Sequence, residues 1–124
     1  MSKLYYTEEH EWVAVEGDEA KVGVTEFAQQ QLGDIVFVDL PELGKQLAKD
    51  QEAVVIESVK AAGEIKSPIE GDVIAINESL VDAPETVNQD PMGDGWFFVL
   101  RIKNSLEIAN LLDEASYRAL IQEK

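Results

Sequence analysis

Apolar and polar residues alternate in short runs along most of the chain. Such alternation, with a period of two, is typical of β-strands that bury one face. Gly17-Asp18 separates the first two runs, and a two-residue linker that contains glycine is a common hairpin turn. We therefore predict strands over residues 11–15, 19–24, 35–40, 53–58, 63–67, 72–77 and 96–103. Many short strands with little helix between them favour an antiparallel sandwich or barrel.

A short helix is predicted between the second and third of these strands. Thr25 can cap it over residues 26–32, and Gly33 can end it. Gln31 belongs to a run of three glutamines that we expect to be solvated, whereas the apolar residues can face the core: Phe27, Ala28 and Leu32. Residues 78–95 contain several prolines and glycines and are expected to be irregular.

The C-terminal segment also has a helical period. Ser105 can cap a helix over residues 106–112, and Asp113 can cap a second over residues 114–122. The second helix carries apolar side chains suited to docking on the sheet, with a hydrophobic staple at its start: Ala115, Leu120 and Ile121, with Leu112 and Tyr117 as the staple. No linker rich in Gly, Ser or Pro separates this segment from the strands, so we predict a single domain over residues 1–124.

The charge balance narrows the classes of partner. The chain has 10 Lys and Arg against 25 Asp and Glu, a net charge of -15 at pH 7. A surface of this sign repels phosphate backbones and anionic lipid, so nucleic acid and membranes are not expected partners. No apolar run approaches the roughly 18 residues that cross a bilayer, and the first residues show no secretory or transit-peptide pattern. A bacterial-type cytoplasmic protein is expected, although a mature organellar protein would show the same pattern.

Residues suited to catalysis are few. Cysteine is absent and His10 is the single histidine, so no obvious nucleophile stands beside a base. His10 lies within an acidic segment, but neighbouring positions on a strand face opposite ways and could not easily converge on one metal ion. The chain is therefore predicted to be acted upon by enzymes rather than to be one, with no metal site.

Lys60 differs from the other lysines in its place between two predicted strands. Residues 54–66 are expected to form a hairpin with Lys60 at or near its tip. Val59 and Ala61 beside it are small and uncharged, and the strands would hold the amine at a fixed position, as a modifying enzyme requires. Other lysines lie in predicted turns or on a strand and are interpreted as solubility residues: Lys45, Lys49 and Lys66. By position alone, an ordinary exposed lysine remains the alternative.

Glu57-Ser58-Val59-Lys60-Ala61 resembles the lipoylation motif of glycine cleavage system H proteins. The resemblance extends over nearly the whole chain through segments at matching spacing: His10-Glu11-Trp12-Val13, Gly23-Val24-Thr25 with Ala28, Leu32 to Pro41, Ser67 to Gly71, Val87-Asn88, Pro91 and Gly95-Trp96. Biotin carriers share the hairpin but typically place methionines beside the lysine, where this chain has Val59 and Ala61. The match therefore favours a lipoyl group.

The resemblance implies a lipoyl/biotinyl-carrier-like fold, a flattened β-barrel or sandwich of antiparallel strands. It further implies lipoic acid joined by an amide to Lys60 of a monomeric carrier. The partners would be a PLP-dependent glycine decarboxylase (P protein), a tetrahydrofolate-dependent aminomethyltransferase (T protein), dihydrolipoamide dehydrogenase (L protein) and lipoate-attaching enzymes. The carrier would shuttle the aminomethyl group of glycine from the first to the second, and the dihydrolipoyl arm to the third.

The resemblance also indicates residues that would shelter the loaded arm. The family lines an arm cleft with a carboxylate in the His-Glu-Trp segment, which corresponds to Glu11. A second acidic position, often Asp, lies four residues after the lysine and is Glu64 in this chain. Some relatives have a histidine where this chain has Gln31. For Glu11 and Glu64, surface solvation is the alternative.

Two other functions stay open at this point. An H-like lipoyl relay would donate lipoyl groups to 2-oxo acid dehydrogenase subunits and would use the same Lys60. An enzyme in its own right would need a convergent polar set, and the sequence shows none.

Overall fold

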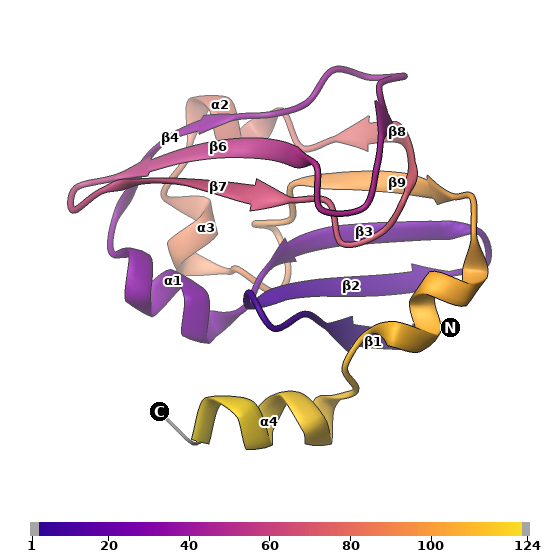
Figure 1. The fold of residues 1–124 in the computed structure, drawn as a ribbon. Helices are drawn as coiled ribbons and strands as arrows, with labels where there is room; N and C mark the ends of the chain where they lie inside the picture. Colours follow the sequence, from indigo (N-terminus) through magenta and orange to yellow (C-terminus); the bar gives the residue numbers. More distant parts are fainter. Residues whose placement is uncertain (1–2, 123–124) are drawn as a thin grey trace.

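Two antiparallel sheets make up the protein, whose residues 3–122 are described in a computed structural model (Figure 1). The larger sheet has six strands in the spatial order β1 (Lys3–Tyr6), β2 (Glu11–Glu16), β3 (Glu19–Val24), β9 (Phe98–Ile102), β8 (Gly71–Ile76) and β5 (Gln46–Leu47). The smaller sheet has three, in the order β4 (Ile35–Asp39), β6 (Glu52–Ser58) and β7 (Ala62–Lys66). Neither sheet closes on itself, so of the two architectures expected from the alternation the sandwich is the one found.

The core is built from the inward positions of the alternating strands. On β6, Val54 and Ile56 are buried while Glu57 is exposed, which is the pattern of a strand with one face covered. The same cluster joins Val22 of β3 and Leu100 of β9. Each such aliphatic side chain, when fully buried, stabilises the fold by roughly 1.5–3 kcal/mol. The hydrophobic effect therefore holds the two sheets together.

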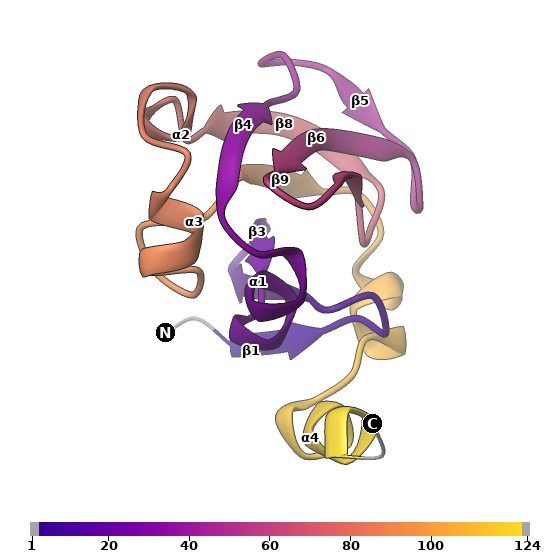
Figure 2. The same ribbon diagram turned by 90° about the vertical axis from the view of Figure 1, so that its left-hand side faces the viewer.

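The helix α1 (Glu26–Leu32) forms as the sequence predicts. The Thr25 hydroxyl accepts a hydrogen bond from the Ala28 amide at 3.2 Å and so caps the first turn. Gly33 ends the helix with a φ of 80°, a conformation that side chains disfavour. Ala28 is buried against the core and Leu32 packs on it. Figure 2 shows α1 between the small sheet and the edge strand β1.

Several short elements were not expected. The strands β1 and β5 are additions, and the stretch predicted to be irregular contains two one-turn helices, α2 (Ser79–Asp82) and α3 (Thr86–Gln89). Neither of these helices has a side-chain cap, so the usual sequence signal for a helix start is missing. The last strand begins at Phe98 rather than at residue 96, and Phe97 is also buried although it breaks the alternation.

The C-terminal segment differs in part from its prediction. Its first helix is a 3-10 helix, η1 (Ser105–Asn110), and Asn104 rather than Ser105 caps it through a hydrogen bond from the Leu106 amide. The second, α4 (Glu114–Gln122), is capped as expected by Asp113, which accepts a hydrogen bond from the Ser116 amide at 2.8 Å. Within residues 3–122, no helix is long and apolar enough to span a membrane.

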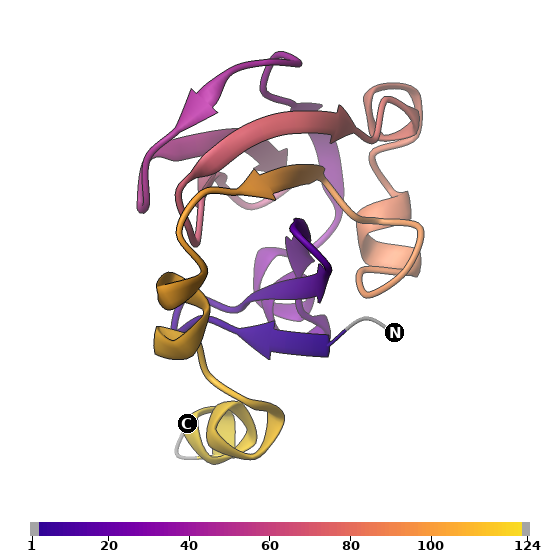
Figure 3. The same cartoon turned by 90° about the vertical axis from the view of Figure 1, so that its right-hand side faces the viewer.

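Tyr117 anchors α4 to the sheet. Its ring stacks on Tyr6 of β1 with 4.6 Å between ring centroids, and its hydroxyl lies 2.8 Å from His10 Nδ1 and 2.7 Å from Thr25 Oγ1. Ala115, expected to dock on the sheet, is exposed instead, because the helix turns its Tyr117 face inward. Figure 3 shows the yellow α4 beside the indigo β1.

Candidate functional site

Lys60 lies in the turn that joins β6 to β7, as the sequence predicts. Its backbone amide and that of Ala61 both donate to the Ser58 hydroxyl, at 3.2 and 3.1 Å. The Ser58 amide in turn donates to the Ala61 carbonyl at 2.8 Å, which closes the turn. The Lys60 side chain is exposed, and the hairpin tip projects beyond the rest of the small sheet (Figure 1). The local hydrogen bonds therefore fix the backbone while leaving the amine accessible.

Gly33 and Asp34, which follow α1, contact the hairpin tip. The Val59 amide donates to the Asp34 carbonyl at 3.0 Å. The stem of Lys60 runs across Gly33, where an added Cβ would lie 3.2 Å from the Lys60 Cε and 3.4 Å from its Cδ. Gly33 therefore serves two needs at once, since its positive φ ends the helix and its missing side chain leaves room for the lysine stem.

Asn88 of α3 fixes the backbone between α1 and β4. Its Oδ1 accepts a hydrogen bond from the Ile35 amide at 2.8 Å, and its Nδ2 donates to the Gly33 carbonyl at 2.8 Å and to Gln29 Oε1 at 3.0 Å. The side-chain amide thus satisfies backbone groups on both sides of Asp34. Sequence reasoning gave Asn88 no role, and its only signal was its place in one of the matching segments.

Glu11 lies at the start of β2 and is buried, with 3% of its surface exposed. One carboxylate oxygen accepts a hydrogen bond from the Thr7 hydroxyl at 3.2 Å, and the other accepts from the Lys66 amide at 3.1 Å. Burial raises the pKa of Glu11 to about 7, although the hydrogen bond from Lys66 opposes that shift. Surface solvation does not describe this residue.

A pocket of about 300 Å³ opens beside Glu11, between the β1–β2 loop, the turn after β7 and the end of η1. Four of its eleven lining residues are acidic, and the full lining is Tyr6, Thr7, Glu8, Glu9, Glu11, Lys49, Asp50, Pro68, Asn110, Leu111 and Leu112. The one basic residue of this lining, Lys49, pairs with Asp50 at 3.3 Å. The pocket is therefore suited to a small group that carries a positive charge.

Glu64 is not part of that lining. It is exposed on β7, and a hydrogen bond with its carboxyl group raises the pKa of Glu52 on the neighbouring strand. Gln31 is exposed on α1, as the sequence predicts. The structure thus does not bring Glu64 and Glu11 together in one pocket.

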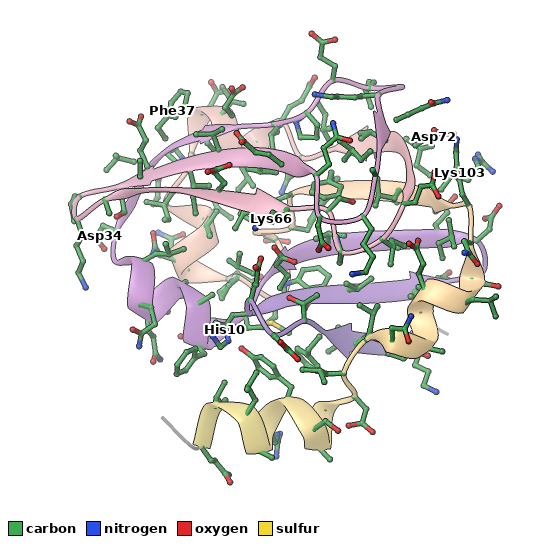
Figure 4. The ribbon with its side chains drawn as sticks, in the orientation of Figure 1. His10, Asp34, Phe37, Lys66, Asp72 and Lys103 are labelled. Carbon is green, nitrogen blue, oxygen red and sulfur yellow. The ribbon has the colours of Figure 1, made fainter. Side chains whose placement is uncertain are left out.

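Lys60 and the pocket lie at opposite ends of β7. Four residue steps along this strand span roughly 13 Å, at about 3.3 Å per residue. Figure 4 shows the separation, with Asp34 beside the tip and Lys66 at the other end of β7. The Lys66 amine pairs with Glu9 at 3.7 Å, at the pocket end. An arm attached to Lys60 would have to lie back along β7 to enter the pocket.

Comparison with known proteins shows similarity to a single family over nearly the whole chain. Residues 4–124 match the family described as "Glycine cleavage H-protein". The chain is 50% identical to the glycine cleavage system H protein of Rhodospirillum rubrum, over 99% of this chain and 98% of that protein. It is 52% identical to that of Aeromonas salmonicida, over 99% and 96%. A crystal structure of a glycine cleavage system H protein from Mycobacterium marinum superposes with a TM-score of 0.85 at 30% identity, and covers 97% of each chain.

Proposed function

The chain belongs to the glycine cleavage H-protein family, whose members are lipoyl carriers rather than enzymes, and we propose that Lys60 is the residue that carries its lipoyl group. The observation that supports this most directly is the position of Lys60 at a projecting hairpin tip whose backbone is fixed by Ser58. The stem of the lysine has room across Gly33. These features fit a covalent arm, because the amine is accessible while its root is rigid.

A lipoyl group held by Lys60 would supply disulfide–dithiol chemistry. At the decarboxylase the disulfide would be reduced as one sulfur takes up the aminomethyl group, the aminomethyltransferase would remove that group, and dihydrolipoamide dehydrogenase would oxidise the remaining dithiol back to the disulfide. The protein supplies the tether, which raises the local concentration of the arm at whichever enzyme is docked. The bacterial relatives support a cytoplasmic setting for this exchange.

Glu11 and its pocket are proposed to shelter the charged end of the loaded arm. A buried carboxyl whose pKa is raised to about 7 is poised to ionise when a cation enters beside it. The exposed neighbours Glu8 and Glu9 extend the acidic wall toward solvent. Glu64 is proposed to contact the arm along its path, since its carboxylate lies on β7 between the root of the arm and the pocket.

Reconstitution tests the proposal. The lipoylated protein should support exchange of bicarbonate with the carboxyl group of glycine when the decarboxylase is added, and Lys60→Arg should support none. A lipoyl relay without a role in glycine cleavage would be lipoylated yet inactive in this exchange. Glu11→Gln should leave lipoylation intact and speed the release of ammonia before the transferase is added. An unchanged rate of ammonia release would argue against the shelter.

A further inference from the structure

Three exposed apolar side chains lie on the Lys60 turn and on the strand that pairs with its hairpin. Val59 at the tip is 67% exposed, and Val36 and Phe37 on the edge strand β4 are 55% and 46% exposed. Neighbours on a regular strand face opposite ways, but the register between β4 and β6 shifts between Ile35 and Phe37. The shift leaves two adjacent large apolar side chains in solvent. We call Val36, Phe37 and Val59 the tip patch.

Backbone hydrogen bonds connect the tip patch to the turn that carries Lys60. The Val59 amide donates to the Asp34 carbonyl at 3.0 Å, and Ile35 pairs with Ser58 across the two strands. Val36 and Phe37 follow directly from this junction. Figure 4 shows Asp34 beside the tip and Phe37 on the outer side of β4. A protein that encloses Lys60 from the β4 side therefore meets the patch.

The charges around the patch are of one sign. Residues 22–44, which include β4, and residues 67–100, which include α2 and α3, contain no Lys or Arg. Asp34 and Asp39 flank the exposed pair on β4, and Glu57 lies opposite Phe37 on β6. Lys60 is the one basic residue between Lys49 and Lys66. A complementary partner surface would be apolar at its centre and basic at its border.

The length of the unmodified lysine side chain indicates which enzyme must contact the tip patch. Before modification the amine extends only as far as its own four-carbon stem. An enzyme that brings this amine to its reacting centre must close over the surface at the root of Lys60, whereas an enzyme that receives a finished arm can stay farther away. We propose that the tip patch is the docking surface for the enzyme that attaches the lipoyl group, with Phe37 as its aromatic anchor.

This inference rests on the proposed lipoylation of Lys60 and predicts the chemistry of the enzyme. The mouth of its amine channel should be an apolar surface bordered by Arg and Lys side chains. The contact is expected to be small, because the complex is transient. Removal of the anchor should therefore act on the KM for the acceptor protein and leave kcat unchanged.

Lipoylation kinetics test the proposal with the full-length acceptor, a lipoate–protein ligase, lipoate and ATP, and with intact mass as the readout. Phe37→Thr and the double variant V36T/F37T keep β-forming side chains on β4. Leu43→Thr is the matched control, because Leu43 is 61% exposed in the loop between β4 and β5. We expect the KM to rise about five-fold or more for Phe37→Thr, further for the double variant, and less than about two-fold for the control. Circular dichroism checks that each variant is folded.

The outcomes separate this inference from the proposed function. Wild-type kinetics for both patch variants, with normal lipoylation at Lys60, would overturn the docking surface and leave the carrier function standing. Absence of a lipoyl group from the wild-type acceptor would contradict the proposed function itself. For the charged border, the wild-type KM should rise as NaCl increases from about 0.05 to about 0.3 M. A KM that does not change with salt would overturn the basic border of the partner.

Discussion

Replacement of Glu11 by glutamine should change how stability depends on pH. The folded protein raises the pKa of this carboxyl from 4.5 to about 7, chiefly through burial. Glutamine keeps the shape, and its oxygen can still accept from the Lys66 amide. Its amide group then faces the Thr7 hydroxyl, which already accepts from the Glu9 and Glu11 amides, so the hydrogen bond from Thr7 is lost. Glutamine cannot ionise. The substitution therefore removes the titration together with one hydrogen bond, and the loss of that hydrogen bond does not itself vary with pH.

The sign and the size follow from proton linkage. Because the pKa is higher in the folded state, the folded protein binds more protons than the unfolded chain between pH 4.5 and about 7. The contribution of Glu11 to stability is thus fully present below pH 4.5 and is lost as the pH rises through about 7. A pKa difference of this size corresponds to about 3 kcal/mol, at 1.36 kcal/mol per pH unit.

Urea denaturation followed by tryptophan fluorescence measures the effect. The difference in unfolding free energy between Glu11→Gln and the wild type should shift in favour of the variant by up to about 3 kcal/mol between pH about 4 and about 8. Glu8→Gln is the control, because this exposed carboxylate of the same loop loses little hydration on folding. A difference that is the same at both pH values would refute the reasoning, since a group that titrates alike in the folded and unfolded states has not been desolvated.

The remaining predictions concern the support of the tip and the anchoring of α4. Gly33→Ala should cost about 1–3 kcal/mol in urea denaturation, because its φ of 80° and ψ of -163° form a conformation found almost only in glycine. Gly44→Ala should also lower stability, because its φ is positive. Only Gly33→Ala should slow lipoylation, since an added Cβ at Gly44 has no neighbour within 4 Å. Equal lipoylation rates would show that the contact with the lysine stem is unimportant. Asn88→Ala removes three hydrogen bonds, two of them to backbone groups, and should lower the unfolding free energy by about 2–4 kcal/mol; a loss below about 0.5 kcal/mol would contradict its role as a clamp. Tyr117→Phe keeps the ring stack and deletes the hydroxyl, so hydrogen exchange in α4 should speed up while the rate in β6 stays unchanged; unchanged exchange in α4 would mean that the ring alone holds the helix.

Much of the fold could be predicted because its signals are local. Alternation along β6 reflects one buried face, and the caps of α1 and α4 are satisfied within three residues of Thr25 and Asp113. The turn at the tip depends on the Ser58 hydroxyl, whose hydrogen bonds reach only to Lys60 and Ala61. Such features are encoded within a few neighbouring residues, and the sequence therefore shows them directly.

The features that were missed depend on contacts between distant segments. Asn88 binds the Ile35 amide across 53 positions, and Lys66 donates to Glu11 across 55. Glu11 lies in a polar segment, which left surface solvation open, yet it is buried and accepts a hydrogen bond from the distant Lys66 amide. The spacing between Lys60 and Glu64 does not predict which carboxylates lie near Glu64, because its neighbours depend on the register between β6 and β7.

The most direct test of the central claim is the mass of the intact protein, with peptide mapping, after expression with a lipoate-attaching enzyme. The account predicts one lipoyl increment, located on the peptide that contains Lys60, and none in Lys60→Arg. A biotin increment, or a lipoyl group on another lysine such as Lys66, would contradict it.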